Sequence, residues 1–545
     1  MKLPSLPGRL FRRLPTAYHT LKLDWRTLRL ALAVSRRSRA DEGRRPVICF
    51  NASTRIRGHS LNAAFSLLTS WALRLQGTPI IHFVCRRGMS RCLQGSDEED
   101  VYRPLPCSLC LRQSWVNFAG SERVDFTFKR QNLPAARLEV LDVPALMEYE
   151  HPFENTLVPV GALVLPSVRW RLRRFTLADD EPTRFLYREF ILSALNILGE
   201  FKALLDRVKD PQAIILFNGQ TFPEAIVRWL GIQRGLRVIT HEVSFAPLSA
   251  FFTDGEATAW PMPMGEDFQL GPQENARLDA LMQDRFEGKF SMAGIRFFPE
   301  MRGLNEAFLK KAAGFKQIVP VFTNVIFDTS QQHSNAFFAN MFTWLEALLQ
   351  VIRLRPETLF VIRAHPDEIR PGKSSRESVA MWVKRTGADR LPNVVFVPPE
   401  EYISSYELIR RSRFILIYNS TVGLEASIMG KPVLAAGRGR SSDFDTMYFP
   451  EDQAAYLQQL EAFLTDGEVT ARPEHIRNAR RFFYFHYFIA SLPFGEYIQP
   501  AWLRGFVKWR RFDLGALSAS ASPTMRALMD GILDGGDFML RDARP

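Results

Sequence analysis

Apolar runs typical of buried strands alternate with helical patterns along most of the chain, and no other feature constrains its fold as strongly. Helices are indicated by apolar residues three and four positions apart, and strands by short continuous apolar runs. A strand, a helix and a strand are expected at residues 46–51, 60–76 and 79–84. The same order is expected again at residues 213–217, 223–234 and 237–240. Such units build parallel sheets with crossover helices. We therefore expect residues 46–300 to form an α/β domain with insertions.

The second half of the chain repeats this plan. Alternating strands and helices are expected at residues 317–323, 336–353, 358–363, 377–386, 394–397, 404–412, 414–418, 421–429 and 432–435. This series predicts a second doubly wound sheet over residues 301–470, so the fold class is α/β with two Rossmann-like domains. Proline and glycine within residues 261–303 favour a linker with a crossing helix. Residues 473–509 are predicted to form a long helix, within a segment 471–545 that packs back on both domains.

The positive charge of the chain is concentrated at its beginning. Of a formal net charge of +12, residues 1–45 contribute +9, through twelve Lys and Arg against three Asp and Glu. The rest of the chain is close to neutral, which argues against nucleic-acid binding, because a groove that follows phosphates needs basic residues on the folded body. Residues 1–45 are therefore either a solvated, partly helical leader or an electrostatic attachment to anionic lipid.

Neither a membrane span nor a secretory signal is expected. No run of about 18 apolar residues occurs, and the first residues lack an apolar core followed by a small-residue cleavage site. We therefore expect the protein in the cytoplasm, either in solution or peripherally at the inner face of the membrane.

Polar residues that packing does not require follow three expected strands of the second domain. In open parallel sheets, ligands bind outside the carboxyl ends of the strands. Tyr418 ends one strand, and the small polar residues after it lead into a helix whose first amides can hold a phosphate. Capping of that helix by Ser420 or Thr421 is the simpler alternative, and both roles are compatible. The donor-binding residues expected from this rule are Asn324, Arg363, Asn419, Ser420, Thr421 and Glu425, the last through ribose hydroxyls.

His365 is the main catalytic candidate. It follows the strand expected at residues 358–363 and precedes Pro366, which stiffens the turn. An imidazole there can hydrogen-bond a donor phosphate and, when protonated, neutralise or protonate the leaving group. A His-Pro pair alone indicates a structural turn. Its position about fifty residues before the Asn-Ser-Thr helix start, in the same sheet, favours the catalytic role.

Two segments, 363–368 (RAHPDE) and 418–433 (YNSTVGLEASIMGKPV), resemble the bacterial capsule polysaccharide biosynthesis family, which includes the Kdo transferases that prime capsules. They are also similar, more distantly, to bacterial sialyltransferases and wall-teichoic-acid polymerases. The similarity covers about residues 315–440 and extends weakly to 216–220 (LFNGQ) and 238–242 (VITHE). The resemblance implies a two-domain GT-B fold whose domains face across a cleft, with His365 and Ser420/Thr421 on the donor phosphate.

A transferase also needs a base or nucleophile that faces the donor across the cleft. Glu242 follows the strand expected at residues 237–240 and is our candidate, with a solvated loop carboxylate as the alternative. Asn218 and Gln220 follow the strand expected at residues 213–217 and are either acceptor-side hydrogen-bonding residues or turn formers. No Asp-x-Asp motif lies near a strand end, so we expect no catalytic metal.

Four of the five cysteines are clustered, at Cys85, Cys92, Cys107 and Cys110. In a cytosolic protein such a cluster favours a metal site over disulfides. The Cys-x-x-Cys pair suits a structural zinc that staples a loop insertion, although the spacing from Cys85 to Cys92 is wider than in the usual zinc knuckle. An iron–sulfur cluster, free thiols and a disulfide are the alternatives.

The sequence thus predicts a glycosyltransferase that moves a sugar from a nucleotide-activated donor, CMP-Kdo or a similar one, to a lipid-linked or growing cell-surface polysaccharide such as capsule. A nonhydrolysing sugar-nucleotide epimerase and a noncatalytic capsule assembly or export partner are the alternatives. The leader favours an acceptor presented on lipid, and the intact set of polar residues argues against lost turnover. The expected partners are the donor, the acceptor, the inner-membrane surface and a capsule export complex, without nucleic acid.

Overall fold

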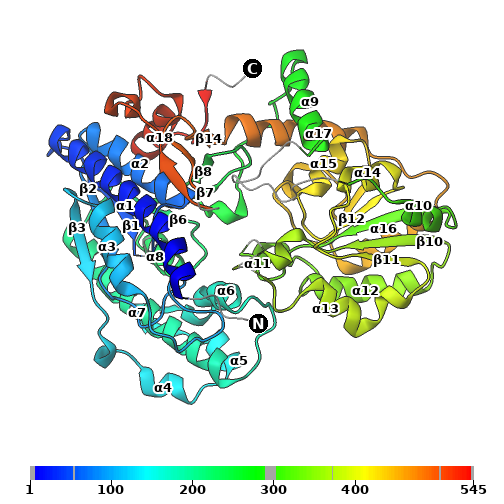
Figure 1. Ribbon diagram of the computed structural model, residues 1–545, viewed down its shortest axis with the longest axis horizontal. Coiled ribbons are helices and arrows are strands. Elements are labelled where there is room, and N and C mark those ends of the chain that lie inside the picture. Colours follow the sequence, from blue (N-terminus) through cyan, green and yellow to red (C-terminus); the bar gives the residue numbers. More distant parts are fainter. Residues whose placement is uncertain are drawn as a thin grey trace.

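The computed structural model describes residues 6–52, 56–288, 302–329, 331–370, 372, 374–502 and 505–541, with side chains from Thr20 onward. Figure 1 shows two domains side by side, the N-terminal one in blue and cyan and the C-terminal one in green and yellow. Each is built on a largely parallel sheet covered by helices, so the expected fold class, α/β with two Rossmann-like domains, is confirmed. Residues 289–301 of the expected linker lie outside the described residues.

The N-terminal domain contains a seven-stranded sheet in the order β14-β8-β7-β6-β1-β2-β3. Its strands are β1 (Val47–Asn51), β2 (Ile80–Cys85), β3 (Glu122–Phe126), β6 (Ala213–Phe217), β7 (Val238–Val243), β8 (Ser249–Thr253) and β14 (Leu492–Pro493). The central strand β1 runs parallel to β2 and β6, with Val47 opposite Ile80 and Ala213. The strand order reverses between β1 and β6, as in a doubly wound fold. β8 and β14 add an antiparallel edge that we did not predict.

Helices cover both faces of this sheet. The helices of the domain are α1 (Leu6–Arg37), α2 (Leu61–Leu75), α3 (Cys107–Asn117), α4 (Ala135–Glu139), α5 (Val143–Met147), α6 (Val160–Leu172), α7 (Glu181–Val208), α8 (Glu224–Gln233) and α18 (Pro523–Asp534). One apolar core joins the sheet to α6, α7 and α8, and a second joins its other face to α1, α2 and α18. Two hairpins complete the domain, β4 (His151–Phe153) with β5 (Thr156–Val158), and β15 (Ile498–Pro500) with β16 (Val507–Trp509).

The C-terminal domain contains a five-stranded parallel sheet in the order β11-β10-β9-β12-β13. Its strands are β9 (Gln317–Phe322), β10 (Thr358–Arg363), β11 (Val394–Val397), β12 (Ile415–Ile417) and β13 (Val433–Ala435). Its helices, with the crossing helix α9, are α9 (Pro272–Phe286), α10 (Glu306–Ala312), α11 (Gln331–Ser334), α12 (Met341–Arg353), α13 (Val379–Thr386), α14 (Ser405–Arg411), α15 (Val422–Ile428), α16 (Gln453–Thr465) and α17 (Pro473–Tyr484). The strand order reverses between β9 and β12, which makes their carboxyl ends the expected ligand site.

The long helix predicted for residues 473–509 is wrong beyond Ile489. α17 continues only as one π-helical turn, Phe485–Ile489, and the chain then forms β14, β15 and β16. Pro493 and Pro500 explain the difference, because a proline lacks the amide that an interior helical position must donate. The chain instead pairs with the edge of the N-terminal sheet, with Leu492 opposite Ala250. The segment after α17 therefore completes the N-terminal domain, which Figure 1 shows in orange and red.

The solvated leader is wrong as an interpretation of residues 20–37, whereas residues 39–45 are exposed. The helix α1 packs on α2, α3 and β16, and Ala31 and Val34 are fully buried there. Thr27 lies 2.9 Å from the ring of His59 and accepts a 2.8 Å hydrogen bond from the indole of Trp509. Residues 1–5 of the leader lie outside the described residues. No helix in the described part of the chain is both long and apolar enough to cross a bilayer.

Candidate active site between the two domains

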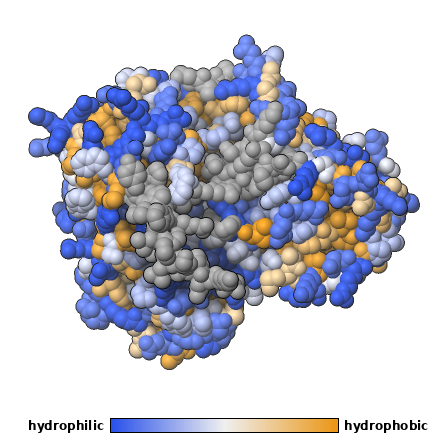
Figure 2. Space-filling model, in the orientation of Figure 1, coloured by the Kyte–Doolittle hydropathy of each residue, from blue (hydrophilic) through white to orange (hydrophobic). Residues whose placement is uncertain are grey.

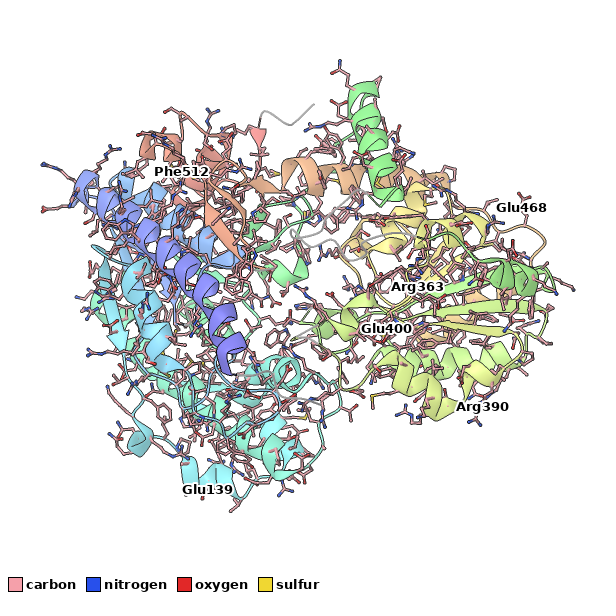
Figure 3. The ribbon with its side chains drawn as sticks, in the orientation of Figure 1. Glu139, Arg363, Arg390, Glu400, Glu468 and Phe512 are labelled. Atoms are coloured by element: carbon pink, nitrogen blue, oxygen red, sulfur yellow. The ribbon has the colours of Figure 1, made fainter. Side chains whose placement is uncertain are left out.

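A cavity of about 500 Å³ lies between the domains, at the carboxyl ends of the C-terminal strands. It is lined by Thr258, Ala259, Trp260, Asn324, Val325, Asp328, Gln331, His333, Ser334, His365, Asp367, Asn419, Ser420, Thr421, Arg438, Gly439, Arg440 and Asp443. Figure 3 labels Arg363 and Glu400 at the end of the C-terminal sheet that faces the N-terminal domain, and Arg390 at the opposite end. The cavity therefore occupies the position at which doubly wound sheets bind ligands.

Asn324 and Asn419 connect the two strand ends where the sheet order reverses. The amide of Asn419 donates to Oδ1 of Asn324 at 3.3 Å. The Asn419 side chain donates to Ser334 and accepts from Gln331, so α11 is tied to the same strand end. These bonds fix the floor of the cavity before any ligand enters.

Ser420 and Thr421 lie at the start of α15, on the wall of the cavity. Thr421 occupies the N-cap position, but its side chain makes no capping hydrogen bond. Capping alone therefore does not explain the polar residues at this position. Their hydroxyls are placed to donate to the oxygens of an anionic ligand.

His365 lines the same cavity, directly after β10. Its Nδ1 accepts a 3.1 Å hydrogen bond from the amide of Asp367, which leaves Nε2 as the protonated nitrogen of the neutral ring. Burial lowers the pKa of His365 below its usual value, although Asp367 and Asp328 oppose the shift. The imidazole is therefore neutral near pH 7 and suited to donate one hydrogen bond.

Arg440 lines this cavity and contacts the N-terminal domain, and we did not identify it from sequence. Its guanidinium lies 3.8 Å from the ring centre of Trp260 and 4.8 Å from that of Phe245. Burial lowers its pKa to about 10, with Asp328 and Glu242 acting in the opposite direction. Arg438 and Arg440 follow β13, so the strand-end rule could have found them had it been applied to that strand too.

Glu242 is held in a fixed position near the cavity, although it does not line it. Its carboxylate accepts from the side chains of Asn62 at 3.0 Å and Asn218 at 2.9 Å. Burial raises its pKa above the usual value, and the nearby Asp328 acts in the same direction. The solvated loop carboxylate that we weighed as the alternative is therefore wrong. Asn218 both turns the chain, with φ of 62°, and orients Glu242.

Gln220 contacts the other domain and does not line the main cavity. Its side-chain amide lies 3.3 Å from both Gln332 and the Nε2 of His333. His333 also lies 2.5 Å from Glu256 of the N-terminal domain. Burial favours a raised pKa for Glu256, but the contacts with His333, Thr258 and Arg228 outweigh it and lower the pKa. This group joins the domains beside the cavity.

Two of the expected donor-binding residues do not reach the cavity. Glu425 is 4% exposed and points into the core, where it pairs with Arg285 and accepts a 2.7 Å hydrogen bond from Tyr406. A carboxylate on the first turn of a helix lies on the buried face here, because α15 packs tightly against α17. Arg363 is also buried and is absent from the cavity lining. The predicted contact between Glu425 and a ribose is therefore wrong.

The four clustered cysteines line one cavity of about 30 Å³ in the N-terminal domain. Burial raises the pKa of Cys85 and Cys92 to about 12. No disulfide links cysteines among the described residues, and there no group of three or more His, Cys, Asp or Glu side chains is arranged around a single ion. This cavity shares no lining residue with the site between the domains.

The buried pair predicts that Glu425 contributes to stability. Replacing it by alanine (Glu425→Ala) removes the carboxylate that pairs with the buried Arg285, which should lower the free energy of unfolding by about 3–5 kcal/mol, measured by urea denaturation. Glu461→Ala is the matched control, because its pair with Arg355 is half exposed and should cost less than about 1 kcal/mol. A Glu425→Ala protein of wild-type stability that binds donor weakly would restore the ribose role.

Comparison with known proteins finds a family match in the second half of the chain. Residues 300–459 match the family described as "Capsule polysaccharide biosynthesis protein". No curated protein sequence matches the chain. Among solved structures, the chain is similar to the KpsC beta Kdo 2,4 transferase of Thermosulfurimonas dismutans, with 13% identity, a TM-score of 0.35, and 50% of this chain and 79% of that chain covered.

A UDP-GlcNAc 2-epimerase from Neisseria meningitidis is also similar, with 13% identity, a TM-score of 0.25, and 80% of this chain and 97% of that chain covered. Structural likeness this low does not distinguish a transferase from an epimerase. The family match is more informative, because it contains β9 to β13 and all the cavity residues that these strands carry. Residues 300–459 are therefore similar to the capsule polysaccharide biosynthesis family, and the rest of the chain lies outside this match.

Proposed function

We propose that this protein is a glycosyltransferase that moves a sugar from a nucleotide-activated donor to a lipid-linked or growing cell-surface polysaccharide such as capsule. One observation carries the proposal: the segment that matches the capsule family forms most of a polar cavity, which the N-terminal domain covers. A transferase of this kind binds the donor at the strand ends of one domain and the acceptor on the other. It therefore needs a cavity between the two domains.

The donor phosphate is assigned to the cationic and hydroxyl groups of the cavity. Ser420, Thr421 and the Nε2–H of His365 provide neutral donors, and Arg438 and Arg440 of the same lining provide positive charge. Such donors stabilise charge that develops on the leaving phosphate as its bond to the sugar breaks. The chemistry suits CMP-Kdo or a similar donor, and it needs no divalent cation to bind the phosphate.

Glu242 is assigned as the base on the acceptor side. In the reaction, an acceptor hydroxyl oxygen bonds to the anomeric carbon, the bond from that carbon to the phosphate breaks, and the hydroxyl proton passes to the carboxylate. Burial and the nearby Asp328, which lines the cavity, raise its pKa, and hydrogen bonds to Asn62 and Asn218 fix its position beside the cavity, so this carboxylate accepts a proton more readily than a free glutamate does.

The exposed face of α1 supports attachment to the cytoplasmic face of a membrane. Leu21, Trp25 and Leu32 are 55%, 62% and 37% exposed, and their spacing of four and seven residues places them on one face of the helix. Arg29 and Arg36 are exposed on the same face. Figure 2 shows hydrophobic beside strongly hydrophilic residues on the side of the molecule that carries α1. Apolar and basic side chains together favour an anionic bilayer, on which a lipid-linked acceptor would be presented.

Replacing His365 by alanine (His365→Ala) should lower turnover about 100-fold or more, because the leaving phosphate loses a positioned hydrogen-bond donor. The measurement is release of nucleotide and transfer of sugar across a panel of CMP-, UDP-, GDP- and dTDP-sugars, with and without a chelator. His151→Ala, in the distant β4–β5 hairpin, is the control and should keep its activity.

The same panel separates the alternatives. Sugar transfer to acceptor supports the proposal, interconversion of the donor without transfer indicates an epimerase, and no turnover of any donor indicates an assembly or export partner. A His365→Ala protein that retains wild-type turnover would exclude His365 from the mechanism.

The Leu21→Ala, Trp25→Ala double variant should bind vesicles of anionic phosphatidylglycerol about 100-fold more weakly than the wild type, since each of the two buried apolar side chains contributes about 1.5 kcal/mol or more. Co-sedimentation measures the binding. Leu354→Ala, at a side chain 77% exposed on the C-terminal domain, should have no effect. Equal binding by the wild type and the double variant, or no wild-type binding, contradicts the attachment.

A further inference from the structure

The four clustered cysteines meet in space although they come from separate segments. Cys85 ends β2, Cys92 lies in the loop after it, and Cys107 and Cys110 lie in the first turn of α3. All four line the same cavity of about 30 Å³, together with Ala52 and Ile56, which follow β1. A chain segment of 26 residues therefore returns on itself to bring every sulfur of the cluster to one place.

Backbone amides are aimed at two of the sulfurs. The amide of Gly88 donates to the Sγ of Cys85 at 3.2 Å, and the amide of Gly95 donates to the Sγ of Cys92 at 3.2 Å. The two bonds repeat one spacing, with the donor three residues after the cysteine. A neutral thiol is a weak hydrogen-bond acceptor. In iron–sulfur clusters, hydrogen bonds to the ligating sulfurs help to set the reduction potential.

The two glycines cannot be replaced without disturbing this arrangement. A Cβ at Gly88 would lie 2.2 Å from the ring of Phe126, and one at Gly95 would lie 3.2 Å from the Sγ of Cys92. At both positions the backbone lies so close to its neighbours that little room is left for a side chain.

Positive charge also surrounds the sulfurs. Arg87 lines the cavity, and the buried Arg171 donates to the backbone oxygen of Leu93, next to Cys92. Cys107 and Cys110 belong to the first turn of an 11-residue helix, at its positive end. An anionic centre held by the four sulfurs would therefore have positive groups and backbone amides beside it.

We propose that Cys85, Cys92, Cys107 and Cys110 bind a [4Fe–4S] cluster. Four cysteine thiolates are the ligand set of such clusters. A single zinc ion requires sulfurs about 2.3 Å from one point, and among the described residues no side chains are arranged around a single ion. The sulfurs instead border a cavity, which is the arrangement that a polynuclear centre needs.

The cluster would be structural. Its cavity shares no residue with the site between the domains, so it takes no part in sugar transfer. It would tie the loop after β2 to α3 at the carboxyl edge of the N-terminal sheet. The loop carries the acidic run Asp97, Glu98, Glu99 and Asp100, and its contacts with the core come from Met89, Leu93 and Val101.

The test is the metal and sulfide content of the full-length protein, isolated without oxygen, chelators or a metal-affinity tag. The proposal predicts about four iron and four acid-labile sulfide per chain, a visible absorption band, and a paramagnetic resonance signal after reduction. The Cys107→Ser, Cys110→Ser variant should lose both elements. Cys49→Ala should retain them, because Cys49 is buried in β1, outside the cluster.

The wild-type composition decides the question even if the double variant fails to fold. One zinc per chain without sulfide would overturn the cluster in favour of a single-ion site. Absence of iron and zinc, with all four thiols reacting with a thiol reagent in the unfolded protein, would overturn metal binding altogether.

Discussion

The carboxyl ends of two largely parallel sheets face the same space, and the rest of the structure depends on keeping them there. Contacts that involve charged side chains hold the two domains in this position. Arg440 lies over Trp260, His333 pairs with Glu256, and Arg173 donates to the backbone of Gly372 at 2.8 Å. After α17 the chain returns to the N-terminal sheet as β14, so the two domains are also joined through the backbone on both sides.

This arrangement places partly buried charges of both signs around one cavity. Arg440 has a pKa lowered to about 10 by burial, and Glu242 has a pKa raised by the same cause. Groups that are fixed and poorly solvated before the ligand arrives stabilise developing charge without reorganising. Because burying an unpaired charge is unfavourable, such groups need partners. Asn62 and Asn218 hold Glu242, and aromatic rings cover Arg440.

The sequence predicts the parallel strands and their order of appearance because buried strands and amphipathic helices have distinct periods. The same rule locates Asn324, His365, Asn419, Ser420 and Thr421, all of which line the cavity. It fails for Glu425, since the direction in which a helical side chain points depends on what packs against the helix. Arg285, its partner, is 140 residues away, and sequence patterns do not reveal such pairs.

Other features are equally hidden from a local analysis. Trp260 and His333 reach the cavity from segments that show no strand-end pattern, because the cavity is completed by contacts between domains. The edge strand β14 has only two residues, and β8 runs antiparallel to β7 without a crossover helix between them. The helix α1 resembles a charged tail until its buried face is seen against α3. The cysteine cluster is visible in the sequence, but the convergence of its sulfurs on one cavity is not.

The central claim is that the donor binds at the strand ends of the C-terminal domain. Hydrogen–deuterium exchange with the nucleotide of the sugar donor that the protein turns over tests it most directly. The account predicts slower exchange at the amides of residues 419–425 and 438–440, which border the cavity, and unchanged exchange at Gly88 and Gly95. Slower exchange confined to the N-terminal domain, with no change at residues 419–425 at saturating nucleotide, would contradict it.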